Sequence, residues 1–294
     1  MTEPHIKAEN LSLHIGKNHI LNDISFDLSG NKIIGLLGRN SAGKTTLLSV
    51  LAAYRHPTTG TLKLNKREIF EDATSMEQIS FIKEESFEYE YDKAEKWLND
   101  RKDFRPNFDL EYAKHLVKRF KIPMNQKMYN LSRGMKSALT VTLGLASRCP
   151  ITIFDEAYLG MDAPAREIFY EEVLKDYMEH PRMIILSTHL ISEMDSLFEE
   201  VLIIKDGSLL MHKNTEELLT EGLSITGSAE KIDTWTKGKT ILKEQSLGNT
   251  KSSMIYGPIT NADRETASDS GLQFDPISLQ ELFIHLTEEG ADSE

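Results

Sequence analysis

Residues 1–84 carry the hydrophobic patterning of β-structure. The segments HIKAENLSLHI (5–15) and HILNDISFDL (19–28) predict two strands joined by a tight, glycine-containing turn. The continuous apolar run KIIGLLG (32–38) predicts a strand buried on both faces, and AGKTTLLSVLAA (42–53) follows it with helical spacing. Further strands are expected in HPTTGTLKLN (56–65) and QISFIKE (78–84).

From Glu85 to Lys127 the chain becomes charged and aromatic, with helical spacing. Beyond it, strands and helices alternate, which predicts a mostly parallel α/β core. The expected helices cover 92–101, 110–120, 133–148, 163–179 and 190–198. The expected strands are ITIFDE (151–156), RMIILST (182–188) and the hairpin VLIIKDGSLLM (201–211), which turns at Asp206-Gly207.

The pattern changes again after about Thr215. Short strands are expected in 224–242 and 252–257, and an amphipathic helix in SLQELFIHLTEE (278–289). We therefore divide the chain into a main domain, 1–219, with a helical subdomain at about 85–148, and a C-terminal accessory extension, 220–294.

Composition narrows the functional classes. The formal net charge of −12 and the pI of about 5.3 argue against a nucleic-acid partner, which selects basic surfaces. A single cysteine, Cys149, excludes an intramolecular disulfide framework and suits a reducing compartment. The sequence has no run of about 18 apolar residues, as a membrane span requires, and its start lacks the features of a secretion signal. We expect a cytoplasmic protein.

A phosphate-binding motif follows the buried strand. GRNSAGKT (38–45) fits G-x-x-x-x-G-K-[ST] and opens the helix, as the motif requires. Glycines let the backbone N–H groups curl around phosphate oxygens, Lys44 supplies a positive charge, and the Thr45 hydroxyl can bind Mg²⁺. The alternative is a chance glycine-rich turn. The residues expected to contact the nucleotide are Gly38, Arg39, Asn40, Ser41, Ala42, Gly43, Lys44, Thr45 and Thr46.

Two acids end the next predicted core strand. Asp155 lies where ligands gather in open α/β sheets, and we expect it to hold Mg²⁺ through water. Glu156 is the candidate general base that polarises the attacking water. The alternative for this pair is an acidic cap of the following helix. His189, after the strand 182–188, reaches the same rim and could contact the γ-phosphate, although a histidine in such a place is more often structural.

The order of these motifs resembles that of the nucleotide-binding subunits of ABC transporters, from about His5 to Leu219. The family's signature, D-loop and post-strand histidine correspond to LSRGMK (131–136), LGMD (159–162) and STH (187–189). The resemblance implies an α/β fold, a P-loop NTPase ABC cassette. It comprises a RecA-like core, an N-terminal antiparallel β subdomain and a helical subdomain, to which this chain adds a small α+β C-terminal extension.

The resemblance also implies roles for further residues. Ser132 and Gly134 of the signature would bind the γ-phosphate of an ATP held by a second copy, and Asp162 would lie at the same interface. Departures from the family pattern are Arg133 and Met135 in the signature, Glu84 in place of the usual glutamine, and Ile15 in place of the usual adenine-stacking aromatic, near which His14 could substitute. Glu84 could bind Mg²⁺, together with Thr45 and Asp155.

The family works as a pair of ATPase subunits that power a membrane protein. The resemblance therefore implies a homodimer or heterodimer that hydrolyses ATP with Mg²⁺ on the inner face of the membrane, bound to an integral-membrane subunit. The acidic, aromatic segment 84–91 would help to receive a basic helix of that subunit. LSRGM and Glu84 are similar to those of bacitracin-type and other peptide or antibiotic exporters. The alternatives are a soluble ABC-type ATPase acting on ribosomes or DNA, and a small-molecule kinase.

Overall fold

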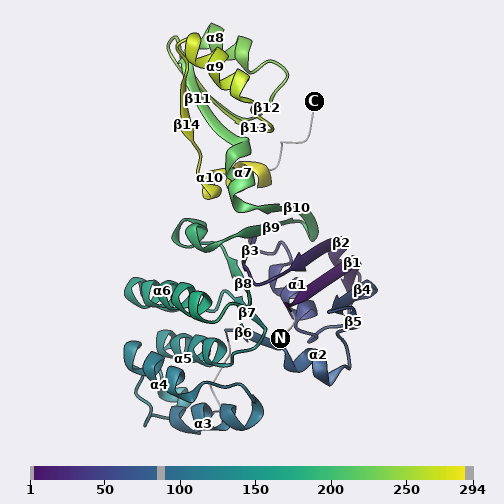
Figure 1. Ribbon diagram of the computed structural model, residues 1–294, viewed down its shortest axis with the longest axis vertical. Helices are drawn as coiled ribbons and strands as arrows, with labels where there is room; N and C mark the ends of the chain where they lie inside the picture. The colour runs from purple at the N-terminus through teal and green to yellow at the C-terminus, as the bar shows by residue number, and fades with distance from the viewer. Residues whose placement is uncertain (1–2, 85–89, 289–294) are drawn as a thin grey trace. The chain divides into compact units, whose positions relative to one another are not determined.

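The computed structural model describes residues 3–84 and 90–288, and Figure 1 shows the chain from end to end. Its internal contacts define two compact units. The cassette unit comprises Met1–His189 and Leu202–His212, and the C-terminal unit comprises Leu190–Val201 and Lys213–Glu294. Among the described helices, none combines the length and the apolar character that a membrane crossing requires.

An antiparallel sheet forms the N-terminal part of the cassette unit, in the strand order β2-β1-β4-β5. The predicted hairpin is confirmed, because β1 and β2 pair antiparallel around Gly16, whose φ is 63°. Alternate residues of both strands are buried, as expected for a sheet with one face on the core. The strands are β1 (His5–Ile15), β2 (Asn18–Ser29), β4 (Thr59–Leu64) and β5 (Arg67–Glu68).

The central sheet has the strand order β10-β9-β3-β8-β7-β6 within the described residues. The pairs β3–β8, β8–β7 and β7–β6 are parallel, which confirms the predicted α/β core. Every residue of β3, β7 and β8 is buried, because helices and the other sheet cover both faces. The strands are β3 (Ile33–Gly38), β6 (Ile79–Lys83), β7 (Ile151–Asp155), β8 (Met183–Thr188), β9 (Glu200–Lys205) and β10 (Ser208–Asn214).

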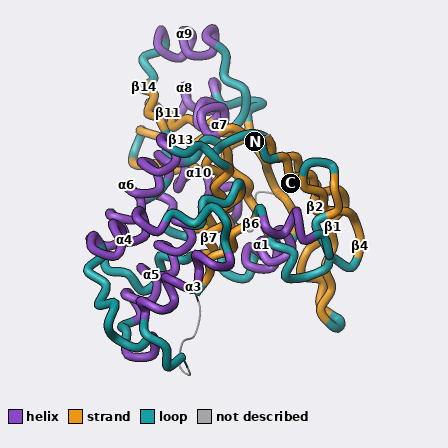
Figure 2. Tube along the Cα trace, turned by 60° about the horizontal axis from the view of Figure 1, so that its bottom comes forward, coloured by secondary structure: helices purple, strands orange, loops and turns teal. Residues whose placement is uncertain are grey.

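Helices surround this sheet, and three of them gather beside β6. Helix α5 contacts β6 and β7 as well as α3 and α4, so the helical subdomain attaches to the core through α5. Figure 2 shows α3, α4 and α5 grouped together at one end of the central sheet. The helices of the cassette unit are α1 (Lys44–Leu51), α2 (Ala73–Glu77), α3 (Ala94–Phe104), α4 (Leu110–Arg119), the 3₁₀ turn η1 (Met128–Asn130), α5 (Arg133–Ala146) and α6 (Ala163–Glu179).

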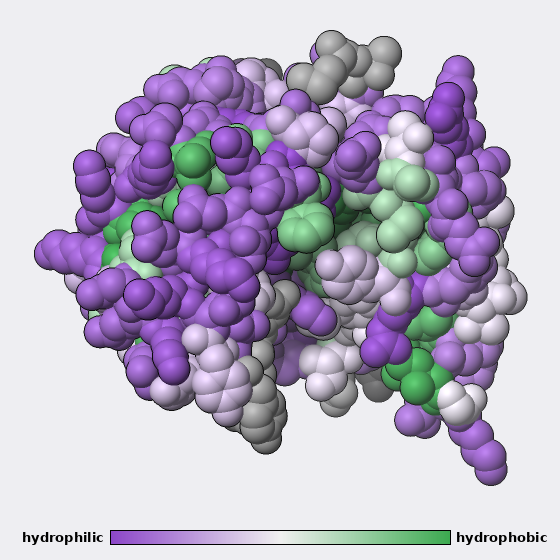
Figure 3. Space-filling view, turned by 90° about the horizontal axis from the view of Figure 1, so that it is seen from below, coloured by the Kyte–Doolittle hydropathy of each residue, from purple (hydrophilic) through white to green (hydrophobic). Residues whose placement is uncertain are grey.

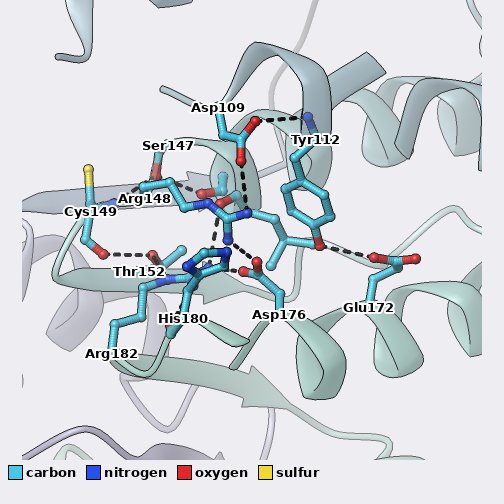
Figure 4. A network of polar contacts seen from close by, with 12 residues as sticks. Asp109, Tyr112, Ser147, Arg148, Cys149, Thr152, Glu172, Asp176, His180 and Arg182 are labelled. Carbon is cyan, nitrogen blue, oxygen red and sulfur yellow. Dashed lines mark hydrogen bonds and ion pairs between the residues drawn. The ribbon is translucent and has the colours of Figure 1, made fainter. Parts of the chain in front are cut away.

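A chain of ion pairs joins α4 to the core (Figure 4). Asp109 caps α4 by accepting from the Tyr112 N–H at 2.9 Å, and it accepts from Arg148 Nη2 at 3.1 Å. Arg148 and Arg182 both donate to the buried carboxylate of Asp176 on α6. Burial lowers the pKa of Arg182 to about 10, so it stays charged at neutral pH. Because these charges compensate one another, we interpret the network as a structural tie between subdomain and core.

Two expectations were wrong. The segment 190–198 forms two 3₁₀ turns, η2 (Ile191–Glu193) and η3 (Asp195–Leu197), rather than an α-helix. The buried side chains of Ile191, Met194 and Leu197 recur every three residues, which is the 3₁₀ period. Part of the stretch expected as strands, 229–235, is the helix α8, since Ile232 and Trp235 need the helical period to reach one core.

The C-terminal unit contains a β-α-β-β-α-β arrangement with the antiparallel strand order β12-β13-β11-β14. Its small core comprises Ile225, Ile232, Ala267 and Leu272, with Trp235 and Phe274 packed against them. The predicted closing helix is confirmed as α10. The elements are α7 (Thr215–Glu221), β11 (Gly222–Ser228), α8 (Ala229–Trp235), β12 (Thr240–Leu247), β13 (Thr250–Tyr256), α9 (Asn261–Asp269), β14 (Gln273–Pro276) and α10 (Leu279–Thr287).

Candidate nucleotide-binding site

The phosphate-binding loop connects β3 to α1, as its motif predicts. Gly38 ends β3, and Gly43 caps α1 with a φ of 104°, which a side chain would disfavour. The Lys44 ammonium lies across the loop and donates to the carbonyls of Gly38, at 2.8 Å, and Arg39, at 3.3 Å. The backbone N–H groups at the start of α1 point out of this loop with the positive end of the helix dipole, a geometry that favours phosphate.

The loop opens into a pocket of about 380 Å³. Its walls come from the loop itself, from Glu156 at the end of β7 and from Ile20 on β2. Ile20 was missed by sequence reasoning, because nothing in its own pattern distinguishes it from other strand residues. The lining residues are Ile20, Asn40, Ser41, Gly43, Lys44, Thr45, Thr46 and Glu156.

A distant turn supports the loop from behind. Gly207, in the turn between β9 and β10, donates its N–H to the carbonyl of Ala42 at 3.1 Å and accepts from the Asn22 N–H at 2.8 Å. A Cβ at Gly207 would lie 2.4 Å from the carbonyl oxygen of Ile20. The sequence predicts the turn through Asp206-Gly207, but it gives no sign that the turn touches the phosphate loop.

The two predicted acids end β7 with different surroundings. Asp155 is 6% exposed, and its Oδ1 accepts from the Ser187 hydroxyl at 2.7 Å. The same hydroxyl accepts from the Glu156 N–H at 3.0 Å, and Glu156 takes a φ of 47°. Ser187 therefore fixes both acids, a role that its position two residues before His189 could have suggested.

Two of the predicted catalytic side chains, Lys44 and His189, lie beside the third, Glu156. Its Oε1 lies 3.5 Å from Lys44 Nζ and 3.3 Å from His189 Nδ1. Glu156 and His189 directly follow the parallel strands β7 and β8, and Lys44 begins α1 after the loop that follows β3, at the edge where the sequence placed them. Lys44 is buried, whereas His189 is 40% exposed and open to solvent.

The oxygen ligands near the loop suit a magnesium ion whose other ligands come from a nucleotide phosphate and water. Thr45 and Asp155 offer oxygen ligands, the kind that Mg²⁺ prefers. Within residues 3–84 and 90–288, no three His, Cys, Asp or Glu side chains cluster as a ready metal cage. This partial donor set fits Mg²⁺, which usually takes its other ligands from water and nucleotide phosphates.

The predicted signature lies at the start of α5. Ser132 caps the helix, and its hydroxyl accepts from the Met135 N–H at 3.3 Å. The Ser137 hydroxyl donates to the carbonyl of Leu159 at 2.6 Å, and a Cβ at Gly134 would lie 2.8 Å from the Gly160 carbonyl oxygen. The signature and the segment 159–162 are therefore packed together.

Asp162 has a local role in that packed segment. It caps α6 by accepting from the Ala165 N–H at 3.0 Å. This bond leaves the place of Asp162 in a subunit interface as a prediction.

Glu84 pairs with Arg133 in this structure. Arg133 Nε lies 2.6 Å from Glu84 Oε1, and Nη2 lies 3.1 Å from Oε2. Both residues were singled out because they depart from the family pattern, but the sequence gave no reason to pair them. The metal role of Glu84 stays a prediction.

The tips of β1 and β2 lie next to Ile20, which lines the pocket. Ile15 is 46% exposed, and the rings of His14 and His19 have their centroids 3.9 Å apart. These tips therefore offer two neighbouring imidazole rings and an exposed aliphatic side chain. Adenine stacking by His14 stays a prediction.

A second depression lies between the core and the helical subdomain. Figure 3 views the molecule from below, where apolar residues lie between two mostly hydrophilic regions. The predicted docking segment 84–91 falls largely on residues 85–89, outside the described residues. The lining includes the aromatic Tyr54 and Trp97 and three cationic side chains, so the described part is basic where the sequence suggested an acidic surface. The lining comprises Tyr54, Ser80, Phe81, Ile82, Lys83, Trp97, Arg101, Arg105, Thr140 and Leu143.

Comparison with known proteins connects this site to a family. Residues 21–159 match the family described as ABC transporter. The chain is 27% identical over 220 residues to the ABC transporter ATP-binding protein YtrB of Bacillus subtilis (strain 168), covering 75% of each protein. It is 27% identical over 208 residues to the Nod factor export ATP-binding protein I of Burkholderia lata, covering 69% of this chain and 68% of that protein.

The fold also matches solved structures. One is the dimeric post-hydrolysis state of the ATP-binding cassette MJ0796 bound to ADP and phosphate. The TM-score is 0.61 at 16% identity, and the match covers 71% of this chain and 98% of that one. The predicted α/β cassette fold is thereby confirmed.

Proposed function

Because residues 21–159 match the family described as ABC transporter, we propose that this chain hydrolyses ATP to drive a separate membrane protein. The observation that carries the proposal is the meeting of Lys44 and His189 at one carboxylate oxygen of Glu156, beside the phosphate-loop pocket. Phosphoryl transfer requires mainly positioning and charge, and this arrangement supplies both.

The side chains divide the work of hydrolysis. Lys44 moves from the loop carbonyls to the β- and γ-phosphates, where its charge offsets the charge that develops on the leaving oxygen. Glu156 orients the attacking water and accepts its proton, and His189 holds the carboxylate in place and faces the γ-phosphate. Mg²⁺, held by Thr45 and Asp155, would supply further neutralisation of the phosphate charge.

The signature is proposed to act on a second copy. Ser132 and Gly134 stand at the exposed N-terminus of α5, where a hydroxyl and free N–H groups favour an anion. In an isologous two-fold pair, each signature would close over the ATP on the partner's phosphate loop. The dimeric state of the solved cassette supports a pair, which could be a homodimer or a heterodimer.

The membrane partner is proposed to dock in the depression between core and helical subdomain, on the inner face of the membrane. Lys83, Arg101 and Arg105 make the described lining cationic, and Tyr54 and Trp97 add aromatic surface. A helix that carries acidic and aromatic side chains would complement this lining, whereas the basic helix expected from residues 84–91 stays a prediction. ATP closes the pair, hydrolysis opens it, and the docked helix follows.

We further propose that the transporter is an exporter, with peptides or antibiotics as the first substrates to test. The signature LSRGM and Glu84 support this direction through their resemblance to such exporters. The relative named for Nod factor export supports export in general, although its own name concerns a different cargo.

Two variants test the paired ATPase. Lys44→Ala should weaken ATP binding at least tenfold, because the charge that faces the phosphates is lost. Glu156→Gln should keep ATP binding, stop hydrolysis, and yield an ATP-bound dimer by light scattering with Mg-ATP. Glu111→Gln, which removes an exposed acid of α4, is the control. A Glu156→Gln protein that hydrolysed ATP at the control's rate, or stayed monomeric in saturating Mg-ATP, would contradict the proposal.

A pull-down then identifies the protein that the ATPase drives. The tagged Glu156→Gln chain, extracted from membranes in mild detergent with Mg-ATP, should co-purify with a stoichiometric multi-span membrane protein. Ribosomal or DNA-bound proteins in its place would favour the soluble ABC-type ATPase instead.

A further inference from the structure

An ion pair joins Arg133 and Glu84, two residues that depart from the family pattern at the candidate nucleotide site. The pair is bidentate, with Nε and Nη2 of Arg133 each facing a different oxygen of Glu84. Arg133 is the first residue of α5, directly after the signature serine, and Glu84 directly follows β6. The contact therefore links the signature to the carboxyl edge of the central sheet within one chain.

The backbone beneath Arg133 fixes its direction. A Cβ at Gly160 would lie 2.7 Å from Arg133 Cγ and 3.1 Å from its Cδ, so the side chain passes directly over this glycine. Gly160 has a φ of 91°, a second reason why this position suits a residue without a side chain. Arg133 thus crosses the segment 159–162 before it reaches Glu84.

Glu84 lies close to the predicted metal ligands along the sheet edge. Lys83 pairs in parallel register with Asp155, so Glu84 and Glu156 follow neighbouring strands at the same edge. A carboxylate with both oxygens on a guanidinium keeps only its outer lone pairs for a magnesium ion or its water, and the neighbouring positive charge disfavours a second cation there. The pair and the metal therefore compete for Glu84.

The contact is weak enough to be reversible. The Arg133 side chain is 64% exposed and that of Glu84 is 47% exposed. Ion pairs in such positions alter an equilibrium by about fivefold at most.

We propose that the Arg133–Glu84 pair is an intrachain latch: it competes with magnesium-bound nucleotide for Glu84 and so raises the Mg²⁺ concentration at which two copies pair. The inference rests on the proposed ATP-driven pairing. When Glu84 turns to the nucleotide, the signature is freed from the sheet edge and can face the partner's phosphate.

The test measures Mg²⁺-dependent pairing rather than turnover. In the Glu156→Gln background, with saturating ATP, sedimentation velocity gives the Mg²⁺ concentration at half-maximal dimer. Arg133→Gln should lower that midpoint about two- to fivefold, because Glu84 no longer has to leave a partner. Lys118→Gln, which removes an exposed positive charge in the last turn of α4, should leave the midpoint unchanged.

A double-mutant cycle assigns the effect to the pair itself. With Glu84→Gln already present, Arg133→Gln should no longer lower the midpoint. An Arg133→Gln midpoint equal to that of Lys118→Gln, or an effect that persists without the Glu84 carboxylate, would overturn the latch while leaving ATP-driven pairing intact. Failure of the Glu156→Gln parent to pair at any Mg²⁺ concentration would instead overturn the proposed function, and the latch with it.

Discussion

Single residues far apart in the sequence complete the phosphate site. The motif spacing predicted that Lys44, Glu156 and His189 would reach one rim, and they do, because parallel strands end at a common edge. Ser187 and Gly207 were not predicted. The position of Ser187 two residues before His189 was a hint of its role, whereas Gly207, buried in the β9–β10 turn, has no pattern that announces a partner elsewhere in the chain.

Gly207→Ala tests the support that the β9–β10 turn gives to the loop. The new Cβ would meet the Ile20 carbonyl at 2.4 Å, so the turn must move away from Ala42. We expect ATP affinity to fall several-fold and the protein to lose more than the roughly 1 kcal/mol that a positive φ alone costs. Isothermal titration and urea unfolding give both quantities.

Gly238→Ala is the matched control for this substitution. Gly238 also has a positive φ, of 80°, but a Cβ there would meet nothing within 4 Å. It should show only the backbone cost and unchanged ATP affinity. Equal ATP affinities for the two variants would mean that the turn does not support the loop.

At the scale of elements, the helix α5 carries the signature and lies tightly against the central sheet. The sequence predicted this helix and its start at Ser132, because a capping residue and apolar periodicity agree there. It could not show how closely the helix approaches the sheet. A Cβ at Gly144 would lie 2.5 Å from Ile82 Cγ1 and 2.9 Å from Phe154 Cε1.

Gly144→Ala therefore sets helix propensity against packing. Alanine favours a helix by about 1 kcal/mol over glycine, whereas overpacking a rigid interior costs about 1–3 kcal/mol. Because Phe154 is a buried aromatic ring and Ile82 is partly buried, we expect net destabilisation in urea unfolding. Lys136→Ala, at a less crowded position of α5, is the control and should be nearly neutral. A Gly144→Ala variant more stable than the parent would contradict this close packing.

The tie between α4 and the core predicts a pH dependence. Burial by itself would raise the pKa of Asp109, but hydrogen bonds from the Tyr112 N–H and Arg148 outweigh it, and the net pKa is lowered. The charged form is therefore favoured in the folded state. Its contribution is present above about pH 4 and is lost as pH falls through the lowered pKa.

Asp109→Asn removes the charge and keeps a capping side chain. It should cost about 1 kcal/mol or less at pH 7, since Asp109 is partly exposed, and the difference from the parent should shrink below about pH 4. Urea unfolding between pH 7 and pH 3 measures this. Asp162→Asn, at the N-cap of α6, is the comparison. An Asp109→Asn cost that stayed constant down to pH 3 would show that the charge is unimportant.

At the scale of the whole molecule, the boundary between the two units differs from a simple cut in the sequence. We proposed domains of 1–219 and 220–294, whereas the contacts group Leu190–Val201 with the C-terminal unit. The reason is local: the η2 turn contacts α10, and the Ser192 N–H donates to Gln280 Oε1 at 3.3 Å. A contact between segments 88 residues apart leaves no periodic mark in the sequence.

Truncation after Leu219 tests where the boundary lies. The shortened chain would expose apolar groups around the η2 turn, including Ile191, which is buried in the full chain. Burial of such a side chain is worth about 1.5–3 kcal/mol, so the melting temperature should fall by several degrees. A chain ending at Glu288 is the control and should melt like the parent. Equal melting temperatures for all three chains would favour the boundary at residue 219.

The sequence by itself determined the strand–helix order, the phosphate loop, the acids after β7 and the signature, because each depends on residues that are neighbours along the chain. Tertiary structure decided the rest: the 3₁₀ turns at 191–197, the helix α8, the support from Gly207 and Ser187, and the pairing of Arg133 with Glu84. These features depend on which segments meet in space, and that follows from packing of the whole chain rather than from local pattern.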